Sequence, residues 1–124
     1  MSVTRPLISG LALWAPPIAL MALIFALSAQ PDLNSGLGTI DLIGRKLVHA
    51  TEYGLLTFLW WRALRTIASP RAAVALALGI SIGYAGTDEF HQSYVNGRHA
   101  SPIDVLIDAT GAVAVAALLM RRRA

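Results

Sequence analysis

Residues 7–28, LISGLALWAPPIALMALIFALS, contain no charged side chain. At about 1.5 Å per residue, a helix of this length crosses the roughly 30 Å hydrocarbon core of a bilayer. The pair Pro16-Pro17 predicts a kink near its middle, where neighbouring helices can satisfy the freed carbonyl groups. A cleaved signal peptide is the competing interpretation, with Ala26-Leu27-Ser28 as its closest cleavage site. Because the run is longer than the apolar part of a typical signal peptide, we expect a membrane-spanning helix.

The composition of the whole chain agrees with a membrane protein. Of the 124 residues, 56% are hydrophobic and 14% are charged, and the mean hydropathy is +0.60. Soluble domains carry about 25% charged residues. The length fits a single domain, and the absence of cysteine excludes disulfides and thiolate metal sites. The net charge of +3 does not indicate binding to nucleic acid, because the basic residues stand at the ends of apolar segments and form no single patch.

Three further apolar runs predict three more spanning helices. Together with the first, the expected spans are residues 7–28, 47–64, 71–88 and 103–120. Residues 29–44 are rich in turn formers and predict a loop, with a short interfacial segment at residues 40–43. Trp60 and Trp61, next to basic residues, are typical of the aromatic belt at a membrane interface. The sequence therefore predicts an all-α membrane protein, in which residues 1–124 form one domain with a four transmembrane helix bundle.

Four spans place both termini on the same side of the membrane, and the charges indicate which side it is. The side of the termini carries seven basic residues and no acidic ones: Arg5, Arg62, Arg65, Arg71, Arg121, Arg122 and Arg123. The other side carries Arg45, Lys46 and Arg98 together with all 7 acidic residues. Since basic loops are retained in the cytoplasm, we expect cytoplasmic termini and a multi-pass protein of the cell inner membrane.

Small residues in the third span indicate a contact between helices. Gly79 and Gly83 form a G-x-x-x-G pair, a spacing that lets helix backbones approach closely in lipid. We expect self-association through this pair, with ordinary use of glycine in membrane helices as the alternative.

Residues 84–108, YAGTDEFHQSYVNGRHASPIDVLID, are dense in polar side chains although apolar runs flank them. Such density beside a membrane span is costly and needs a reason. Polar residues also open the neighbouring spans, and helical spacing places most members of each group on one face. The groups at the extracytoplasmic ends are Lys46, His49, Glu52 and Tyr53 in the second span, Asp88, Glu89, His91 and Gln92 in the third, and Asp104 and Asp108 in the fourth. We therefore predict a polar pocket with one side from each of three helices.

Asp104 and Asp108 have different interpretations. Asp104 and Ser101 stand near the start of the fourth span, where helix capping explains them as well as a site does. Asp108 lies at least a turn into the apolar run, where an unpaired carboxylate is expensive. It therefore needs a partner such as Arg98, Lys46 or a histidine.

Three kinds of chemistry fit these residues, and the sequence does not choose among them. The His49-x-x-Glu52 and Asp88-x-x-His91 pairs have a spacing that suits a divalent metal. Alternatively, basic residues hold a phosphate while a histidine acts as base or nucleophile. The third option is a binding site for lipid head groups without any reaction.

The same residues resemble the VanZ-like family of small bacterial integral membrane proteins. The resemblance rests on Lys46-x-x-His49 with Tyr53, Asp88-Glu89-x-x-Gln92, Arg98-x-x-Ser101-x-x-Asp104 and Gly111, and on Ser28-x-Gln30-Pro31 after the first span. It covers nearly the whole chain. One departure is Asp108, where the family more often has asparagine.

The resemblance implies a four-helix membrane domain with its motif residues at the outer face. The family's namesake is an accessory resistance factor against teicoplanin, whereas no biochemical activity is implied. We expect a binding or processing site for envelope lipids, with a membrane enzyme for lipid-linked phosphate or sugar and a purely structural bundle as alternatives. No catalytic residue, metal ion or cofactor is assigned. The residues expected to line the site are Lys46, His49, Glu52, Tyr53, Asp88, Glu89, His91, Gln92, Arg98, Ser101, Asp104 and Asp108.

Overall fold

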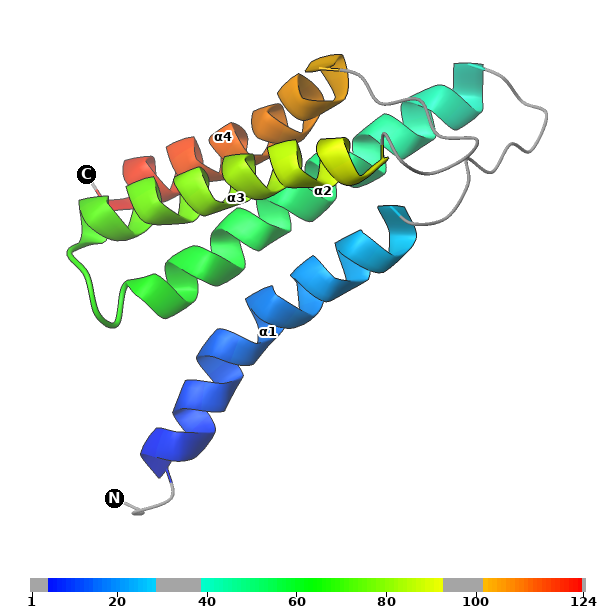
Figure 1. Cartoon of the computed structure of the whole chain (residues 1–124). Helices are drawn as coiled ribbons and strands as arrows, with labels where there is room; N and C mark the ends of the chain where they lie inside the picture. The colour runs from blue at the N-terminus through cyan, green and yellow to red at the C-terminus, as the bar shows by residue number, and fades with distance from the viewer. Residues whose placement is uncertain (1–4, 29–38, 93–101, 124) are drawn as a thin grey trace.

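The computed structural model describes residues 5–28, 39–92 and 102–123, and this part of the chain consists of four helices without any strand (Figure 1). The helices are α1 (Arg5–Ser28), α2 (Thr39–Leu64), α3 (Pro70–Gln92) and α4 (Pro102–Arg123). Each predicted span lies inside one of them, so the all-α class and the four helices are confirmed. Pro70 and Pro102 each open a helix, a position where the missing N–H costs nothing.

The second helix begins earlier than its span predicts. Residues 39–44 are helical, so the predicted loop over residues 29–44 is wrong there, while residues 29–38 lie outside the described residues. Ile40, Ile43 and Leu47 follow one another at helical spacing, and this periodicity outweighs the local preference of Gly44 for a turn. The additional turns carry α2 beyond the length that a bilayer core requires.

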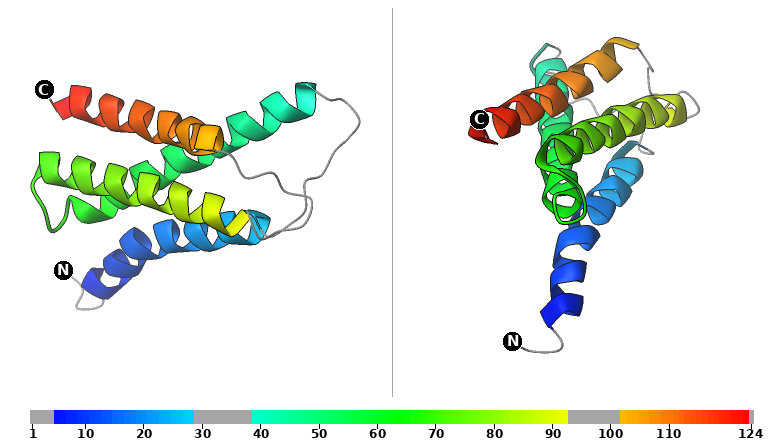
Figure 2. Two further views of the ribbon diagram at one scale, coloured as in Figure 1. Left: turned by 45° about the horizontal axis from the view of Figure 1, so that its top comes forward. Right: turned by 90° about the vertical axis from the view of Figure 1, so that its left-hand side faces the viewer.

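The helix α2 is the centre of the bundle, because it packs against each of the other three. In the described part of the chain, α1 contacts α2 and α3 and does not contact α4. The start of α1, the turn between α2 and α3 and the end of α4 lie at one end of the bundle (Figures 1 and 2). We call this the arginine end, after Arg62, Arg71 and Arg121. The opposite end carries the start of α2 and the end of α3.

Glycines bring α2 and α4 into backbone contact. A Cβ atom built on Gly111 would lie 2.6 Å from the carbonyl carbon of Ala50 and 2.9 Å from its Cα atom. A Cβ atom on Gly54 would lie 3.0 Å from a methyl group of Val115 and 3.2 Å from the Gly111 carbonyl oxygen. Small residues at such crossings allow helices to pack in the membrane without a hydrophobic driving force. The crossing of α2 and α4 therefore depends on Gly54 and Gly111.

The first helix is attached by hydrogen bonds to its backbone carbonyls. Pro16 has no N–H to donate to the carbonyl of Ala12 four residues earlier, and an Arg62 guanidinium N–H donates to that carbonyl instead. The hydroxyl of Tyr84 donates to the carbonyl of Met21. The two halves of α1 run in different directions, as the proline pair predicts (Figures 1 and 2).

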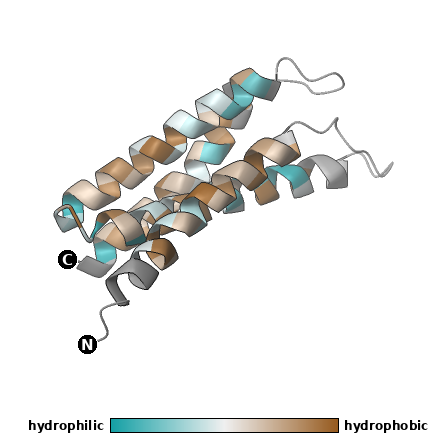
Figure 3. Ribbon diagram, turned by 60° about the horizontal axis from the view of Figure 1, so that its bottom comes forward, coloured by the Kyte–Doolittle hydropathy of each residue, from teal (hydrophilic) through white to brown (hydrophobic). Residues whose placement is uncertain are grey.

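The outer surface of the bundle is apolar. Large hydrophobic side chains are exposed on all four helices, among them Leu11, Ile18, Leu23, Leu47, Leu55, Leu76, Leu106, Val113 and Leu118. Hydrophilic residues gather mostly toward the ends of the helices (Figure 3). Over the described residues, one helix has a window apolar enough to cross a membrane by length and composition: Gly10–Leu27 in α1, with a hydropathy of 2.1. Polar residues such as Lys46 and Glu52 lower the hydropathy of α2 below that level.

Gly79 and Gly83 do not take part in packing within the part of the chain that the structure describes. Both are exposed on α3, and a Cβ atom built on either would meet no atom within 4 Å. Self-association through this pair stays a prediction.

Candidate functional site

Two carboxylates are buried inside the bundle. Asp88 of α3 is 3% exposed and Asp108 of α4 is 4% exposed. Each lies about one to two turns from the end of its helix that faces away from the arginine end. An ionised carboxylate in apolar surroundings is expensive unless polar groups compensate it, and both residues engage in polar or electrostatic interactions. These two side chains form the centre of the candidate site.

His49 of α2 lies against Asp108. Its Nδ1 atom is 3.6 Å from an Asp108 carboxylate oxygen, and the imidazole is 28% exposed. The glycine crossing explains this pairing, because Ala50 follows His49 directly and Gly111 lies one turn after Asp108. A histidine was among the partners predicted for Asp108. The close approach of the two backbones thus brings the imidazole and the carboxylate together.

Tyr53, one turn further along α2, is fully buried. Its ring lies 6.4 Å from that of Tyr84, and its hydroxyl has no hydrogen-bond partner among the described atoms. The charges of Asp88, Asp108 and Glu52 all act on this hydroxyl. The phenol of Tyr53 is therefore within electrostatic range of carboxylates from α2, α3 and α4.

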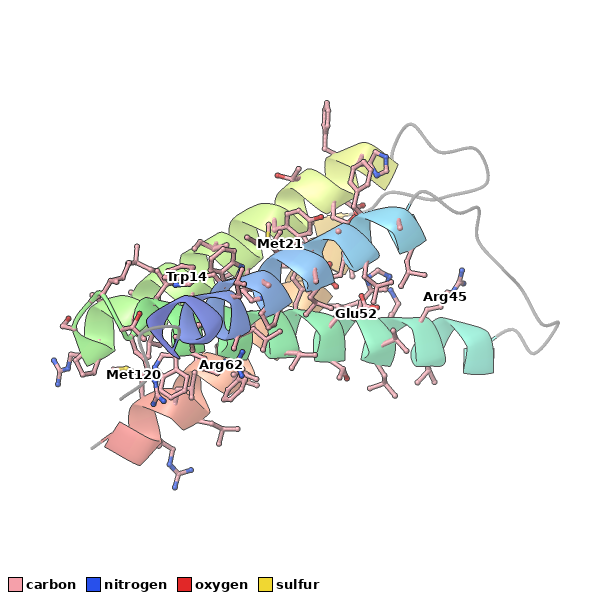
Figure 4. All side chains as sticks on the ribbon, turned by 90° about the horizontal axis from the view of Figure 1, so that it is seen from below. Trp14, Met21, Arg45, Glu52, Arg62 and Met120 are labelled. Atoms are coloured by element: carbon pink, nitrogen blue, oxygen red, sulfur yellow. The ribbon has the colours of Figure 1, made fainter. Side chains whose placement is uncertain are left out.

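Glu52 borders the cluster, and Lys46 stands nearly two turns before it on α2. Both are partly exposed, and the charge of Asp88 acts on Glu52. Figure 4 shows Arg45 and Glu52 on the same part of α2, whereas Trp14, Arg62 and Met120 lie toward the arginine end. Arg45 and Lys46 are both half-buried and both engage in polar or electrostatic interactions. Two cationic residues therefore stand on the stretch of α2 that leads to Glu52.

The first helix also contributes to this end of the bundle, which the sequence did not indicate. The ring of Phe25 stacks on His91 of α3, with centroids 4.1 Å apart and an interplanar angle of 17°. Phe25 belongs to a uniformly apolar run, so no pattern distinguishes it from its exposed neighbours. His91 therefore packs toward α1.

A second polar contact lies deeper in the bundle. The hydroxyl of Thr57 donates to the carbonyl of Tyr53 and lies 2.9 Å from the hydroxyl oxygen of Ser81. Both side chains are fully buried, and they join α2 to α3. Thr57 lies one turn after Tyr53 on the same face, and this spacing is a signal that could have found it.

The remaining predicted site residues have mixed outcomes. Glu89 is partly exposed on α3 and takes part in polar or electrostatic interactions. Arg98 and Ser101 lie outside the described residues, as do the side chains of Gln92 and Asp104. The structure thus brings together His49, Tyr53, Asp88 and Asp108, with Glu52 beside them.

The described residues contain no group of three or more His, Asp or Glu side chains placed to hold a metal ion. The pairs His49–Glu52 and Asp88–His91, which suit metal ligands by spacing, do not converge there on such a set.

Comparison with known proteins identifies a family for this sequence. A family model described as VanZ/LLP1 matches residues 13–123, which include most of α1, the whole of α2, α3 and α4, and every residue of the site. No curated protein and no solved structure matches the chain.

Proposed function

Because this chain belongs to the VanZ/LLP1 family, we propose that it is a multi-pass protein of the bacterial inner membrane whose polar site binds head groups of envelope lipids. In this proposal all four helices cross the membrane. The termini lie in the cytoplasm, and the site around Asp88 and Asp108 faces the outer leaflet.

The exterior and the charges of the chain support the membrane part of this proposal. Large apolar side chains are exposed on all four helices, as a lipid-facing surface requires. The arginine end collects Arg62, Arg71 and Arg121, and the acidic residues of the helices lie toward the other end. Basic residues favour the cytoplasmic side, so this asymmetry supports cytoplasmic termini.

The observation that carries the functional part is the burial of Asp88 and Asp108 beside His49 and Tyr53. Ionisable residues inside membrane spans are rare because they cost several kcal/mol, and they mark ligand or ion sites by default. Packing of the bundle does not require them, since glycines and the hydroxyl pair Thr57–Ser81 already join the helices. A polar ligand is the simplest reason for their presence.

The test separates a binding role from a packing role. Asp88→Asn and Asp108→Asn keep the shape of each side chain and remove its charge. We expect expression of the wild type to change teicoplanin susceptibility, and we expect both variants to reach wild-type levels in the membrane and to lose this phenotype. A loss of phenotype in proportion to a loss of folded protein would leave the cluster with a structural role only.

A membrane enzyme acting on a lipid-linked phosphate or sugar is the second candidate. The observation in its favour is the 3.6 Å approach of Asp108 to the His49 Nδ1 atom. A carboxylate beside one ring nitrogen orients an imidazole, whose other nitrogen can then act as a general base. Incubation of the purified protein with labelled lipid-linked substrates tests this candidate. Product formed by the wild type and absent with His49→Gln favours it, and binding without turnover excludes it.

A further inference from the structure

The hydroxyl of Tyr53 is the feature that indicates what kind of group the site binds. It is completely buried and has no hydrogen-bond partner in the described part of the chain. A buried hydroxyl without a partner is costly, because it has given up its hydrogen bonds to water. The negative charges of the Asp88, Asp108 and Glu52 carboxylates all act on it. A ligand that contacts the phenol at this position is therefore also within range of these three charges.

The carboxylates can accept hydrogen bonds from such a ligand in addition to their present interactions. Each ionised carboxylate offers about four lone-pair sites, and a phenol oxygen also accepts hydrogen bonds. A primary ammonium group carries three donors and no acceptor, so it matches a set made of a phenol and carboxylates. The described residues provide no group of three metal ligands, which favours an ammonium group over a metal ion.

Cationic side chains lie on the same part of α2. Arg45 and Lys46 are both half-buried. Arg45 stands one turn before His49, and Lys46 stands two turns before Tyr53. A phosphate group attracts both side chains, because charge-assisted hydrogen bonds to arginine and lysine are the commonest means of phosphate recognition. On α2, Arg45 and Lys46 therefore stand about two turns before Glu52, whose charge acts on the Tyr53 hydroxyl.

We propose that the site takes a zwitterionic, aminated phospholipid head group, with its primary ammonium between Tyr53, Asp88 and Asp108 and its phosphate against Arg45 and Lys46. This assignment rests on the proposed function, and it adds the chemical class of the ligand. Tyr53 accepts a hydrogen bond from the ammonium group, whose other N–H groups donate to carboxylates of the cluster. The head group thus gives the buried phenol a hydrogen-bond partner and neutralises part of the acidic cluster.

The experiment uses the full chain in detergent, titrated with three lipids that share the same acyl chains and observed by native mass spectrometry. Phosphatidylethanolamine carries the primary ammonium, phosphatidylcholine keeps the charge without N–H donors, and phosphatidylglycerol has no amine. We expect phosphatidylethanolamine to bind the wild type about tenfold more tightly than either of the others, the ratio expected for one hydrogen bond to a charged group. Tyr53→Phe should remove most of this preference.

Tyr84→Phe is the matched control, because its hydroxyl already donates to the Met21 carbonyl. It should retain the preference for phosphatidylethanolamine. If Tyr53→Phe fails to fold, Asp108→Asn serves as the second variant, and a preference that survives in it contradicts the proposal.

The outcomes also distinguish this inference from the proposed function. Equal or tighter binding of phosphatidylglycerol overturns the aminated ligand but leaves a head-group site. If phosphatidylcholine binds as tightly as phosphatidylethanolamine, the site does not recognise the N–H groups of a primary ammonium. The same conclusion follows if Tyr53→Phe and Tyr84→Phe lose the preference for phosphatidylethanolamine equally. Binding of none of the three lipids contradicts the proposed function itself.

Discussion

Replacing Gly111 by alanine disturbs the contact that aligns the candidate site. The new Cβ atom would lie 2.6 Å from the Ala50 carbonyl carbon, whereas ordinary contact begins at 3.4 Å, so the two helices must separate there by at least about 0.8 Å. The obstructing atoms belong to the backbone and cannot rotate away. Overpacking of this kind costs up to about 3 kcal/mol, and the better helix propensity of alanine returns about 1 kcal/mol. We therefore expect a net loss of about 2 kcal/mol in the free energy of unfolding.

Unfolding of the purified protein by sodium dodecyl sulfate in mixed micelles measures this loss. Gly79→Ala is the matched control, because it makes the same change on an exposed helix face with no atom within 4 Å. It should leave the stability unchanged or raise it by up to about 1 kcal/mol. Gly111→Ala should also separate His49 from Asp108 and weaken lipid binding. Equal stabilities of the two alanine variants would refute the close crossing of α2 and α4.

Other predictions concern the attachment of α1, the buried hydroxyl pair and the orientation. Arg62→Ala should lower the free energy of unfolding by about 1–2 kcal/mol, because the Ala12 carbonyl loses its hydrogen-bond donor. The loss should be smaller in a Pro16→Ala background, where residue 16 itself supplies an N–H to that carbonyl. Equal losses in both backgrounds would contradict this role of Arg62. A double-mutant cycle of Thr57→Val and Ser81→Ala should give a coupling of about 0.6 kcal/mol, and no coupling would mean that the hydroxyl pair adds nothing. A reporter fused to the C-terminus should be active in the cytoplasm, whereas activity in the periplasm would reverse the proposed orientation.

The helices could be predicted because their signals are local. Long runs of apolar residues interrupted by prolines and charges identify four helices, and α1 begins and ends within two residues of its predicted span. The start of α2 was missed because Gly44 and the turn formers before it conceal the helical spacing of Ile40, Ile43 and Leu47. Turn propensity is a weak signal beside helical periodicity.

The site was predictable as a set of residues but not as a set of contacts. Helical spacing placed His49 and Tyr53 on one face of α2, and the cost of a buried carboxylate implied a partner for Asp108. Which partner it is depends on how closely α2 approaches α4, and Gly111 determines that distance through a contact far away in sequence. The stacking of Phe25 on His91 depends in the same way on where α1 lies.

The lipid that the purified protein retains from its native membrane tests the central claim most directly. Lipids extracted from equal amounts of folded wild type and Asp88→Asn are identified and quantified by mass spectrometry, with Gly79→Ala as a control for purification. The account predicts one class of lipid in near-stoichiometric amount with the wild type and the control, and its loss with Asp88→Asn. The same lipids in the same amounts in all three samples would contradict a head-group site around Asp88 and Asp108.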